Sequence, residues 1–234
     1  MSIFQFKQFS IKQADSAMKV GTDAMILGAF VETEGKKNAL DVGTGTGVLA
    51  LMLAQKNSEL LITGIEIDAA SATEATFNFQ QSPWSERMNL EHLDFLDFES
   101  SLRFDLIVSN PPYFSTTNEN EDPRKAQARH VSSLYIAPFL KKAHSVLSSD
   151  GCFWLIVPFI DFAKWYTCAE KNGLRVARKI DIIGKEGSQP IRCILQLNQS
   201  AISPKRETFC VRKADNAYTD EYIALTKEFH GVAL

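Results

Sequence analysis

Short runs of apolar, often β-branched residues alternate along the chain with longer stretches that repeat apolar residues at helical spacing. Runs that are apolar throughout, such as Leu-Ile-Val at 106–108 and Trp-Leu-Ile-Val at 154–157, are typical of strands that are buried on both faces of a parallel sheet. The pattern predicts seven strands, at 39–42, 60–67, 88–92, 104–109, 152–157, 175–183 and 191–197. It predicts helices at 22–33, 46–56, 69–81, 132–148, 160–172 and 219–230.

Strands that alternate with helices predict an α/β fold with a doubly wound, mostly parallel sheet of seven strands. Only residues 184–190 join the last two predicted strands, which is too short for a parallel crossover. We therefore expect these two strands to close the sheet as an antiparallel hairpin. We interpret residues 1–234 as one domain, with 1–36 as an N-terminal extension and 200–234 as a C-terminal segment.

Composition excludes several classes of protein. With 234 residues, 45% of them hydrophobic and 23% charged, the chain fits one globular domain and not a disordered or fibrous protein. It has no apolar stretch of roughly 20 residues and no signal-like start, so we expect a cytoplasmic protein without a membrane partner. We also expect a monomer rather than an oligomer. The cysteines form no CxxC pair and are predicted to be core residues, so no metal is expected: Cys152, Cys168, Cys193 and Cys210.

Charge is distributed unevenly along the chain. Residues 1–110 hold 8 Lys+Arg and 15 Asp+Glu, a net charge of -7, whereas residues 111–234 hold 17 and 13, a net charge of +4. We therefore expect a polyanionic partner, if there is one, to contact the second half.

A glycine-rich loop, Asp41-Val-Gly43-Thr-Gly45-Thr-Gly47, follows the first predicted strand and opens a helix. Glycines allow a sharp turn and a close approach of the backbone to a ligand. The spacing is GxGxG and lacks the last glycine of the GxGxxG dinucleotide fingerprint. The acidic Asp41 would repel a diphosphate but would suit a ligand with an ammonium or sulfonium group. The loop therefore favours a cationic ligand over a dinucleotide.

Two carboxylates follow the next two predicted strands. Glu66 lies at a strand end about 20 residues beyond the loop, where a carboxylate accepts hydrogen bonds from ribose hydroxyls. Asp94 can accept from an adenine amino group. In the alternative interpretation the glycines only form a tight turn and the acids cap helices, as we expect for Asp68 and Asp97.

The fourth predicted strand runs directly into Asn110-Pro111-Pro112-Tyr113. A double proline cannot continue a strand or a helix, so it holds the chain rigidly at the same sheet edge. The side-chain oxygen of Asn110 and the carbonyl of Pro111 can each accept an N–H bond from a planar amino group, and Tyr113 can stack on its ring system. The nitrogen lone pair is then directed at an electrophile, here a methyl group on sulfonium. A plain turn is the alternative.

These motifs resemble those of the class I S-adenosylmethionine-dependent methyltransferases that act on the amino groups of adenine, guanine or glutamine. Within that class the chain is similar to the bacterial family that methylates N6 of adenine 37 in valine tRNA. The similarity also includes K-V-G-T-D at 19–23, Q-S-P-W at 81–84, Q-A-R at 127–129 and N-A-Y-T-D-E-Y-I-A-L-T at 216–226. It therefore covers nearly the whole chain.

The resemblance implies S-adenosylmethionine as cofactor and tRNA as partner. It implies that Asn110, Pro111 and Tyr113 are catalytic and that the cofactor contacts Gly43, Gly45, Glu66, Asp94 and Thr22, to which we add Asp41. The basic residues after the catalytic segment are candidate RNA contacts, with a solvated surface as the alternative: Arg124, Lys125, Arg129 and His130. A second basic group precedes the last helix: Lys205, Arg206, Arg212 and Lys213.

Four other interpretations remain open. A protein glutamine amide is one alternative acceptor, although only some 40 residues precede the glycine loop, where glutamine methylases are expected to carry a helical substrate domain. A ribosomal RNA base is another acceptor for the same chemistry. A dinucleotide-dependent dehydrogenase, or an inert binding module with this fold, belongs to a different class, and the glycine spacing and the intact Asn-Pro-Pro-Tyr segment argue against both.

Overall fold

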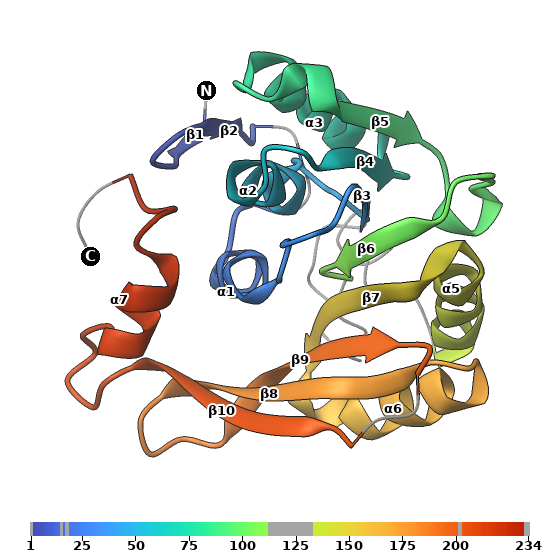
Figure 1. The fold of residues 1–234 in the computed structure, drawn as a ribbon. Coiled ribbons are helices and arrows are strands. Elements are labelled where there is room, and N and C mark those ends of the chain that lie inside the picture. The colour runs from blue at the N-terminus through green and yellow to red at the C-terminus, as the bar shows by residue number, and fades with distance from the viewer. Residues whose placement is uncertain (1, 15, 17–18, 112–132, 201–202, 232–234) are drawn as a thin grey trace, which may run out of the picture.

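A computed structural model describes residues 2–14, 16, 19–111, 133–200 and 203–231 (Figure 1). Eight strands form the main sheet: β3 (Asn38–Val42), β4 (Leu61–Glu66), β5 (Met88–His92), β6 (Phe104–Ser109), β7 (Leu147–Pro158), β8 (Arg175–Lys185), β9 (Pro190–Asn198) and β10 (Lys205–Arg212). They lie in the order β10-β8-β9-β7-β6-β3-β4-β5. Only β9 is antiparallel to its neighbours, β7 and β8. The predicted mostly parallel sheet and its closing hairpin are confirmed.

The sheet has eight strands where the sequence predicts seven. The additional strand, β10, has the sequence KRETFCVR and pairs in parallel with β8 at the edge of the sheet. An edge strand needs little apolar surface, and none of its first six residues is buried, so it lacks the apolar run by which the other strands are recognised. Lys205, Arg206 and Arg212 therefore belong to a strand and not to a loop before the last helix.

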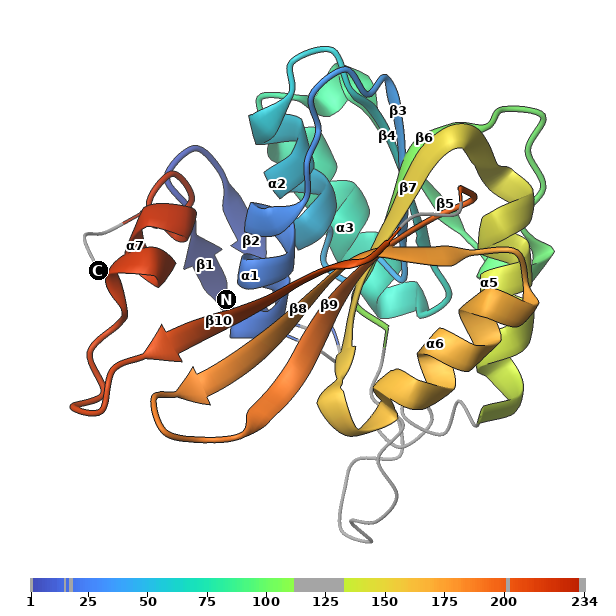
Figure 2. The same ribbon diagram turned by 60° about the horizontal axis from the view of Figure 1, so that its bottom comes forward.

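Helices cover both faces of the sheet, as Figure 2 shows. One face carries α1 (Thr22–Phe30), α2 (Val48–Lys56) and α3 (Ala69–Gln81), and the other carries α5 (Ser133–Val146) and α6 (Phe162–Lys171). A last helix, α7 (Asp220–Thr226), lies near the N-terminal strands, and the described residues also form three short 3-10 helices: η1 (Ser85–Arg87), η2 (Phe95–Asp97) and η3 (Phe159–Asp161). Among the described helices, none has the length and apolar character that a membrane span requires.

The alternating direction of side chains on β7 explains why residues 153–157 of that strand are all apolar. Trp154 and Ile156 pack into the core under α1 and α2, whereas Phe153, Leu155 and Val157 pack into the core under α5 and α6. Successive side chains of a strand point to opposite faces, so a strand between two helical layers needs apolar residues at every position. Cys152 and Cys193 are buried as predicted, and Cys168 and Cys210 are half-buried; all four are free thiols.

The helix caps agree only in part with expectation. Asp68 caps α3, because its carboxylate accepts a hydrogen bond of 2.9 Å from the Ser71 N–H. Asp97 lies inside η2 and does not cap it; Asp94 does, by accepting from the Leu96 N–H. The sequence favours Thr22 or Asp23 as the cap of α1, but this helix begins after Gly21 and has no side-chain cap.

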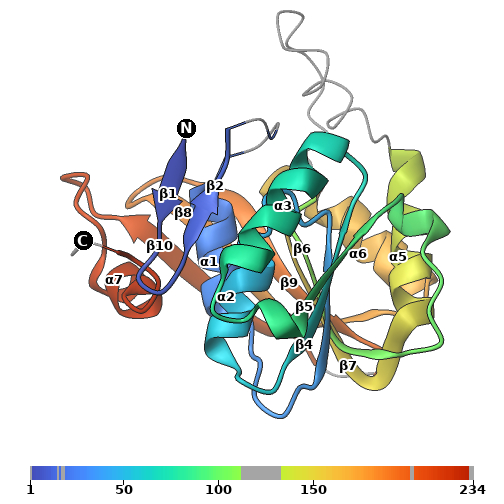
Figure 3. The ribbon, with the colours of Figure 1, turned by 90° about the horizontal axis from the view of Figure 1, so that it is seen from above.

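The two ends of the described chain lie beside each other. The strands β1 (Ile3–Gln5) and β2 (Ser10–Lys12) form a small antiparallel sheet, and the Lys7 N–H donates to the Phe229 carbonyl at 2.9 Å. Seen from above, β2 runs next to α3 while β1 lies toward α7 (Figure 3). The N-terminal segment thus spans from the C-terminal helix to α3.

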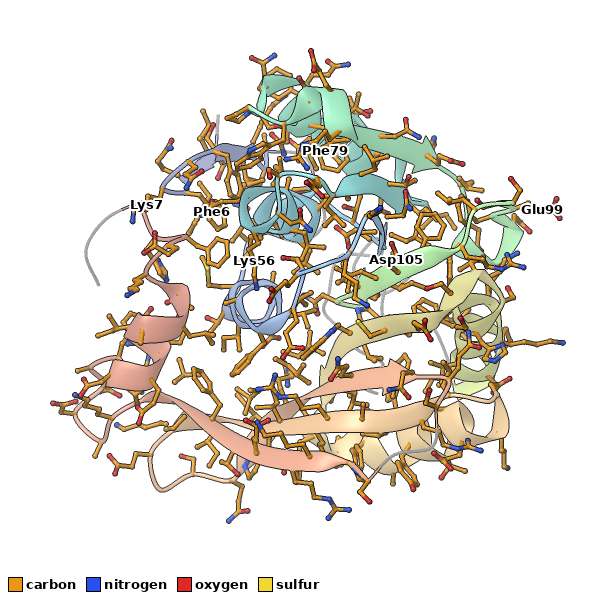
Figure 4. All side chains as sticks on the ribbon, viewed as in Figure 1. Phe6, Lys7, Lys56, Phe79, Glu99 and Asp105 are labelled. Atoms are coloured by element: carbon orange, nitrogen blue, oxygen red, sulfur yellow. The ribbon has the colours of Figure 1, made fainter. Side chains whose placement is uncertain are left out.

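Gly47 adopts a left-handed conformation (φ 86°), and a Cβ there would lie 2.5 Å from the ring of Phe79, which lies between α3 and the sheet (Figure 4). Gly35 has a similar φ of 69° but open space around its Cα.

We expect Gly35→Ala to lower the free energy of unfolding by about 1 kcal/mol and Gly47→Ala by about 2–4 kcal/mol, because only the second adds a buried clash. Urea denaturation of both variants measures this, and equal losses would contradict it.

Candidate functional site

A cavity of about 760 Å³ opens at the carboxyl ends of the parallel strands. Ligands of doubly wound sheets bind at this edge. Seven of the predicted site residues line the cavity together: Thr22, Gly43, Gly45, Glu66, Asp94, Asn110 and Pro111. Tyr113, Arg124, Lys125, Arg129 and His130 lie outside the described residues.

The glycine loop turns back over the end of the sheet. The N–H groups of Gly43 and Thr44 both donate to the Ile65 carbonyl at 2.9 Å, which ties the loop to the end of β4. Gly43 and Gly45 have φ values of 68° and 57°, and no atom lies within 4 Å of a Cβ placed on either. The backbone of the loop therefore faces the cavity directly, where a ligand can approach it closely.

Asp41 does not line this cavity, which corrects its prediction as a residue that contacts the cofactor. Its side chain is fully buried beneath the loop. One carboxylate oxygen, Oδ2, accepts hydrogen bonds from the Thr44 hydroxyl at 2.6 Å and from the Ala50 N–H at 3.1 Å. A residue directly before a turn points either into the crevice or back under the turn, and here the two donors hold it underneath. Asp41 therefore shapes the loop from below.

Glu66 holds the loop from the cavity side. One of its oxygens accepts from the Gly45 N–H and the other from the Asp68 N–H, each at 2.8 Å. Burial raises the pKa of this carboxyl, and the two backbone N–H donors oppose that rise. Each carboxylate oxygen has two lone pairs, so Glu66 can still accept from hydroxyl groups of a ligand.

Asp94 lies next along the sheet edge, since the N–H of the preceding Leu93 donates to the Glu66 carbonyl at 3.1 Å, and it contacts an aromatic side chain of α5. The Tyr135 hydroxyl donates a hydrogen bond to the Asp94 carboxylate, and burial together with that carboxylate raises the pKa of Tyr135. The ring of Phe139 lies 5.7 Å from that of Tyr135 and 6.0 Å from that of Trp165. All three aromatic residues line the cavity.

Sequence reasoning did not identify this aromatic wall. Tyr135 and Phe139 are four residues apart, a spacing that places two side chains on one face of a helix. That spacing is equally typical of an ordinary core helix, so only the fold shows that the face turns toward the cavity.

Asn110 and Pro111 follow β6 between the ends of its two neighbours. The Ser109 hydroxyl donates to the Val42 carbonyl at 2.8 Å, which holds the end of β6 against the end of β3. Asn110 is half-buried and Pro111 is buried, and both contribute to the cavity surface. Both residues therefore lie in the same cavity as the glycine loop.

A further wall of the cavity comes from the start of α1 and the residues just before it. Residues 19–24 line the cavity, including the predicted Thr22 and the adjacent Asp23. The guanidinium of Arg192 on β9 donates to the Asp23 carboxylate at 3.1 Å, which connects this segment to the antiparallel strand. The N-terminal segment and the hairpin thus meet at the mouth of the site.

The family model for the methyltransferase small domain matches residues 8–160, which contain the glycine loop, both carboxylates and Asn110. This chain belongs to the methyltransferase small-domain family. The predicted family is thereby confirmed, and the dehydrogenase and the inert module are set aside.

Relatives of similar length agree with the methyltransferase family. The chain is 37% identical to a protein of Flavobacteriaceae bacterium (strain 3519-10) over 98% of this chain and 99% of the relative, and 37% identical to one of Bacteroides thetaiotaomicron over 97% and 96%. A relative from Vibrio campbellii is 35% identical over 97% of this chain and 95% of its own. All three are named tRNA1(Val) (adenine(37)-N6)-methyltransferase.

Solved structures share the fold of this methyltransferase. A predicted O-methyltransferase from Agrobacterium tumefaciens superposes with a TM-score of 0.67 and 16% identity, covering 91% of this chain and 99% of that one. A putative RNA methyltransferase from Pyrococcus horikoshii gives a TM-score of 0.56 and 18% identity, covering 77% and 84%. At these identities the likeness concerns the fold alone, and it confirms the predicted α/β class.

Burial raises the pKa of Asp41 from 3.8 to about 7, against the two hydrogen bonds that lower it. The folded methyltransferase then binds this proton more tightly than the unfolded chain. The contribution of this bound proton to the stability of the folded state is complete below about pH 4 and is lost as the pH rises toward 7. We expect Asp41→Asn, which cannot ionise, to gain in Tm relative to the unaltered protein between pH 4 and pH 7.

Thermal melts at intervals across that range measure the effect of Asp41→Asn. Asp105 offers a control, because its carboxylate also accepts two backbone N–H bonds, from Lys37 and Asn38, but the residue is only half-buried, whereas Asp41 is fully buried. Asp105→Asn should change Tm by a similar amount at each pH. Parallel pH profiles for Asp41→Asn and the unaltered protein would contradict the assignment.

Proposed function

We propose that this enzyme transfers a methyl group from S-adenosylmethionine to the exocyclic amino group of adenine 37 in valine tRNA. One observation carries the proposal: the Asn110 and Pro111 acceptors line the same cavity as the glycine loop and its carboxylates. The names of the near-full-length relatives support the tRNA and the position.

The described residues of the cavity fit this methyl donor. Glu66 has acceptor capacity for ribose hydroxyls, and Asp94 can accept from the adenine amino group beside the aromatic wall. Four carboxylates and one lysine line the cavity, a balance that favours a cation over a diphosphate: Asp23, Glu66, Asp68, Asp94 and Lys19. When bound, the donor supplies an electrophilic methyl group on sulfonium.

The protein prepares the acceptor amino group. The Asn110 side-chain oxygen and the Pro111 carbonyl each accept one of its N–H bonds, so that the nitrogen lone pair is aimed at the methyl group. The acceptors are fixed before the reaction and strengthen as charge develops on the nitrogen. Tyr113 stacks on the adenine in this proposal and holds its plane.

The proposal assigns the contact with tRNA phosphates to Arg124, Lys125, Arg129 and His130, which follow the catalytic segment in the sequence. It places the enzyme in the cytoplasm as a single-domain monomer that needs no metal. An anticodon loop already exposes its bases, so the target adenine reaches the site at small cost.

Transfer of radiolabelled methyl from S-adenosylmethionine to unmodified valine tRNA tests the function. After nucleoside digestion we expect a labelled product that co-migrates with N6-methyladenosine, and no label on tRNA with guanine at position 37. Label on ribosomal RNA or on a protein glutamine, with none on tRNA, would overturn the proposed substrate and favour one of the two alternative acceptors.

We expect Asn110→Ala to leave the dissociation constant for S-adenosylmethionine within a few-fold and to lower kcat roughly a hundredfold, because the lost interaction acts mainly in the transition state. Asn89→Ala, an exposed asparagine on β5, serves as the control and should keep both values. Calorimetry and single-turnover assays measure the two constants. Turnover like that of the unaltered enzyme in Asn110→Ala would exclude this chemistry.

A further inference from the structure

The N-terminal wall of the cavity, residues 19–24, belongs to no strand of the main sheet. It runs into the first turn of α1, which begins at Thr22, whereas the glycine loop follows β3. A donor that contacts both walls needs a fixed distance between them. Because the sheet does not supply that constraint, side chains must supply it.

Asn78 on α3 makes hydrogen bonds to the glycine loop and to β2, which precedes the wall in the sequence. It is 2% exposed. Its Oδ1 accepts from the Lys12 N–H at 2.9 Å, and its Nδ2 donates to the Lys12 carbonyl at 3.0 Å and to the Thr46 carbonyl at 2.8 Å. One amide thus joins the N-terminal segment to the glycine loop, in keeping with the course of β2 beside α3 in Figure 3.

Glu74, one helical turn before Asn78, extends the attachment. This carboxylate is also 2% exposed and accepts from the Ala14 N–H at 2.7 Å and from the Ser16 N–H at 3.0 Å. Buried backbone N–H groups without a partner are costly, so these side chains replace the strand partner that the segment lacks on this side.

Gln13 carries the attachment to the cavity wall itself. Its side chain is 6% exposed, and its Oε1 accepts from the Val20 N–H at 2.8 Å. Val20 lines the cavity. A continuous path of hydrogen bonds and backbone therefore runs from Asn78 through residues 12 and 13 to the wall, while a second bond from Asn78 reaches the loop on the other side.

We propose that Asn78 is a positioning residue for the methyl donor, which sets the distance between the N-terminal wall and the glycine loop and is supported by Gln13 on the wall side. The inference rests on S-adenosylmethionine as the donor. It assigns a part in cofactor binding to α3 and to Lys12, Gln13 and Val20, none of which carries the glycine motif or its carboxylates.

Calorimetric titration of S-adenosylmethionine into Asn78→Ala tests the proposal. We expect the dissociation constant to rise about fivefold to tenfold, which corresponds to the loss of one or two net hydrogen bonds in placing the walls. At saturating donor, kcat should stay within about twofold, because the acceptor site is untouched.

Asn57→Ala is the matched control. The Asn57 side chain makes the same set of bonds, since its Oδ1 accepts from the Glu59 N–H and its Nδ2 donates to the Thr33 and Lys36 carbonyls, but it lies away from the cavity. We expect this variant to lose thermal stability and to keep its affinity for the donor. Equal weakening in both variants would mean a general loosening and would overturn the proposal.

Gln13→Ala provides a second, independent variant that leaves the Asn78 amide intact. It should raise the dissociation constant for the donor about threefold. In the double variant the dissociation constant should rise by less than the product of the two single increases, because both residues act on one path. Fully multiplicative effects, or binding like that of the unaltered protein in Asn78→Ala, would overturn the proposal. Lack of donor binding by the unaltered protein would instead reject the choice of donor, and the inference with it.

Discussion

A single buried carboxylate, that of Asp41, holds together the turn on which the site is built. Its Oδ2 atom links the end of β3 to the Thr44 hydroxyl in the loop and to the Ala50 N–H in the first turn of α2. The N-terminal N–H groups of a helix have no partner within the helix, and a carboxylate there satisfies one of them. The stabilisation of the carboxylate by these hydrogen bonds is opposed by burial, which raises the pKa of Asp41 to about 7. The loop geometry thus depends on a group that is costly to ionise.

The other walls of the site are arranged around this loop. Glu66 holds the loop backbone on the side of β4, and Asp94 with Tyr135 faces it from η2 and α5. Asn110 arrives from β6 at the same edge because β6 is parallel to β3 and pairs with it. Residues from five separate parts of the chain therefore meet at one point, and the parallel direction of the strands brings them there.

Sequence patterns predicted the elements that are governed by burial. The bounds of β5, β6 and α3 agree with the expected 88–92, 104–109 and 69–81, because each has a clear apolar period and a capping or turn residue at its ends. Strands β1, β2 and β10 were not predicted, since they are short or lie at an edge and carry polar residues. Local periodicity contains no information on pairing with a distant strand.

The predictions for the site have the same limit. Glycines and carboxylates that follow strand ends could be placed in the cavity, because the fold fixes where parallel strands end. The direction of the Asp41 side chain could not be predicted, because it depends on hydrogen-bond donors supplied by the turn itself. The polar contacts of Glu74, Asn78 and Gln13 were also beyond reach, because each joins backbone groups that only the folded chain brings together.

The placement of charge suggests why donor and acceptor are held by different kinds of group. The donor side is lined by carboxylates, of which Asp23 is paired with Arg192 and Glu66 with backbone N–H groups. These favour a cation, and their electrostatic attraction falls once the positive charge is gone. In the proposed function the acceptor side offers the neutral oxygens of Asn110 and Pro111. A neutral acceptor can orient an amino group without adding a full charge beside the reacting nitrogen, so the two halves of the cavity perform separate electrostatic tasks.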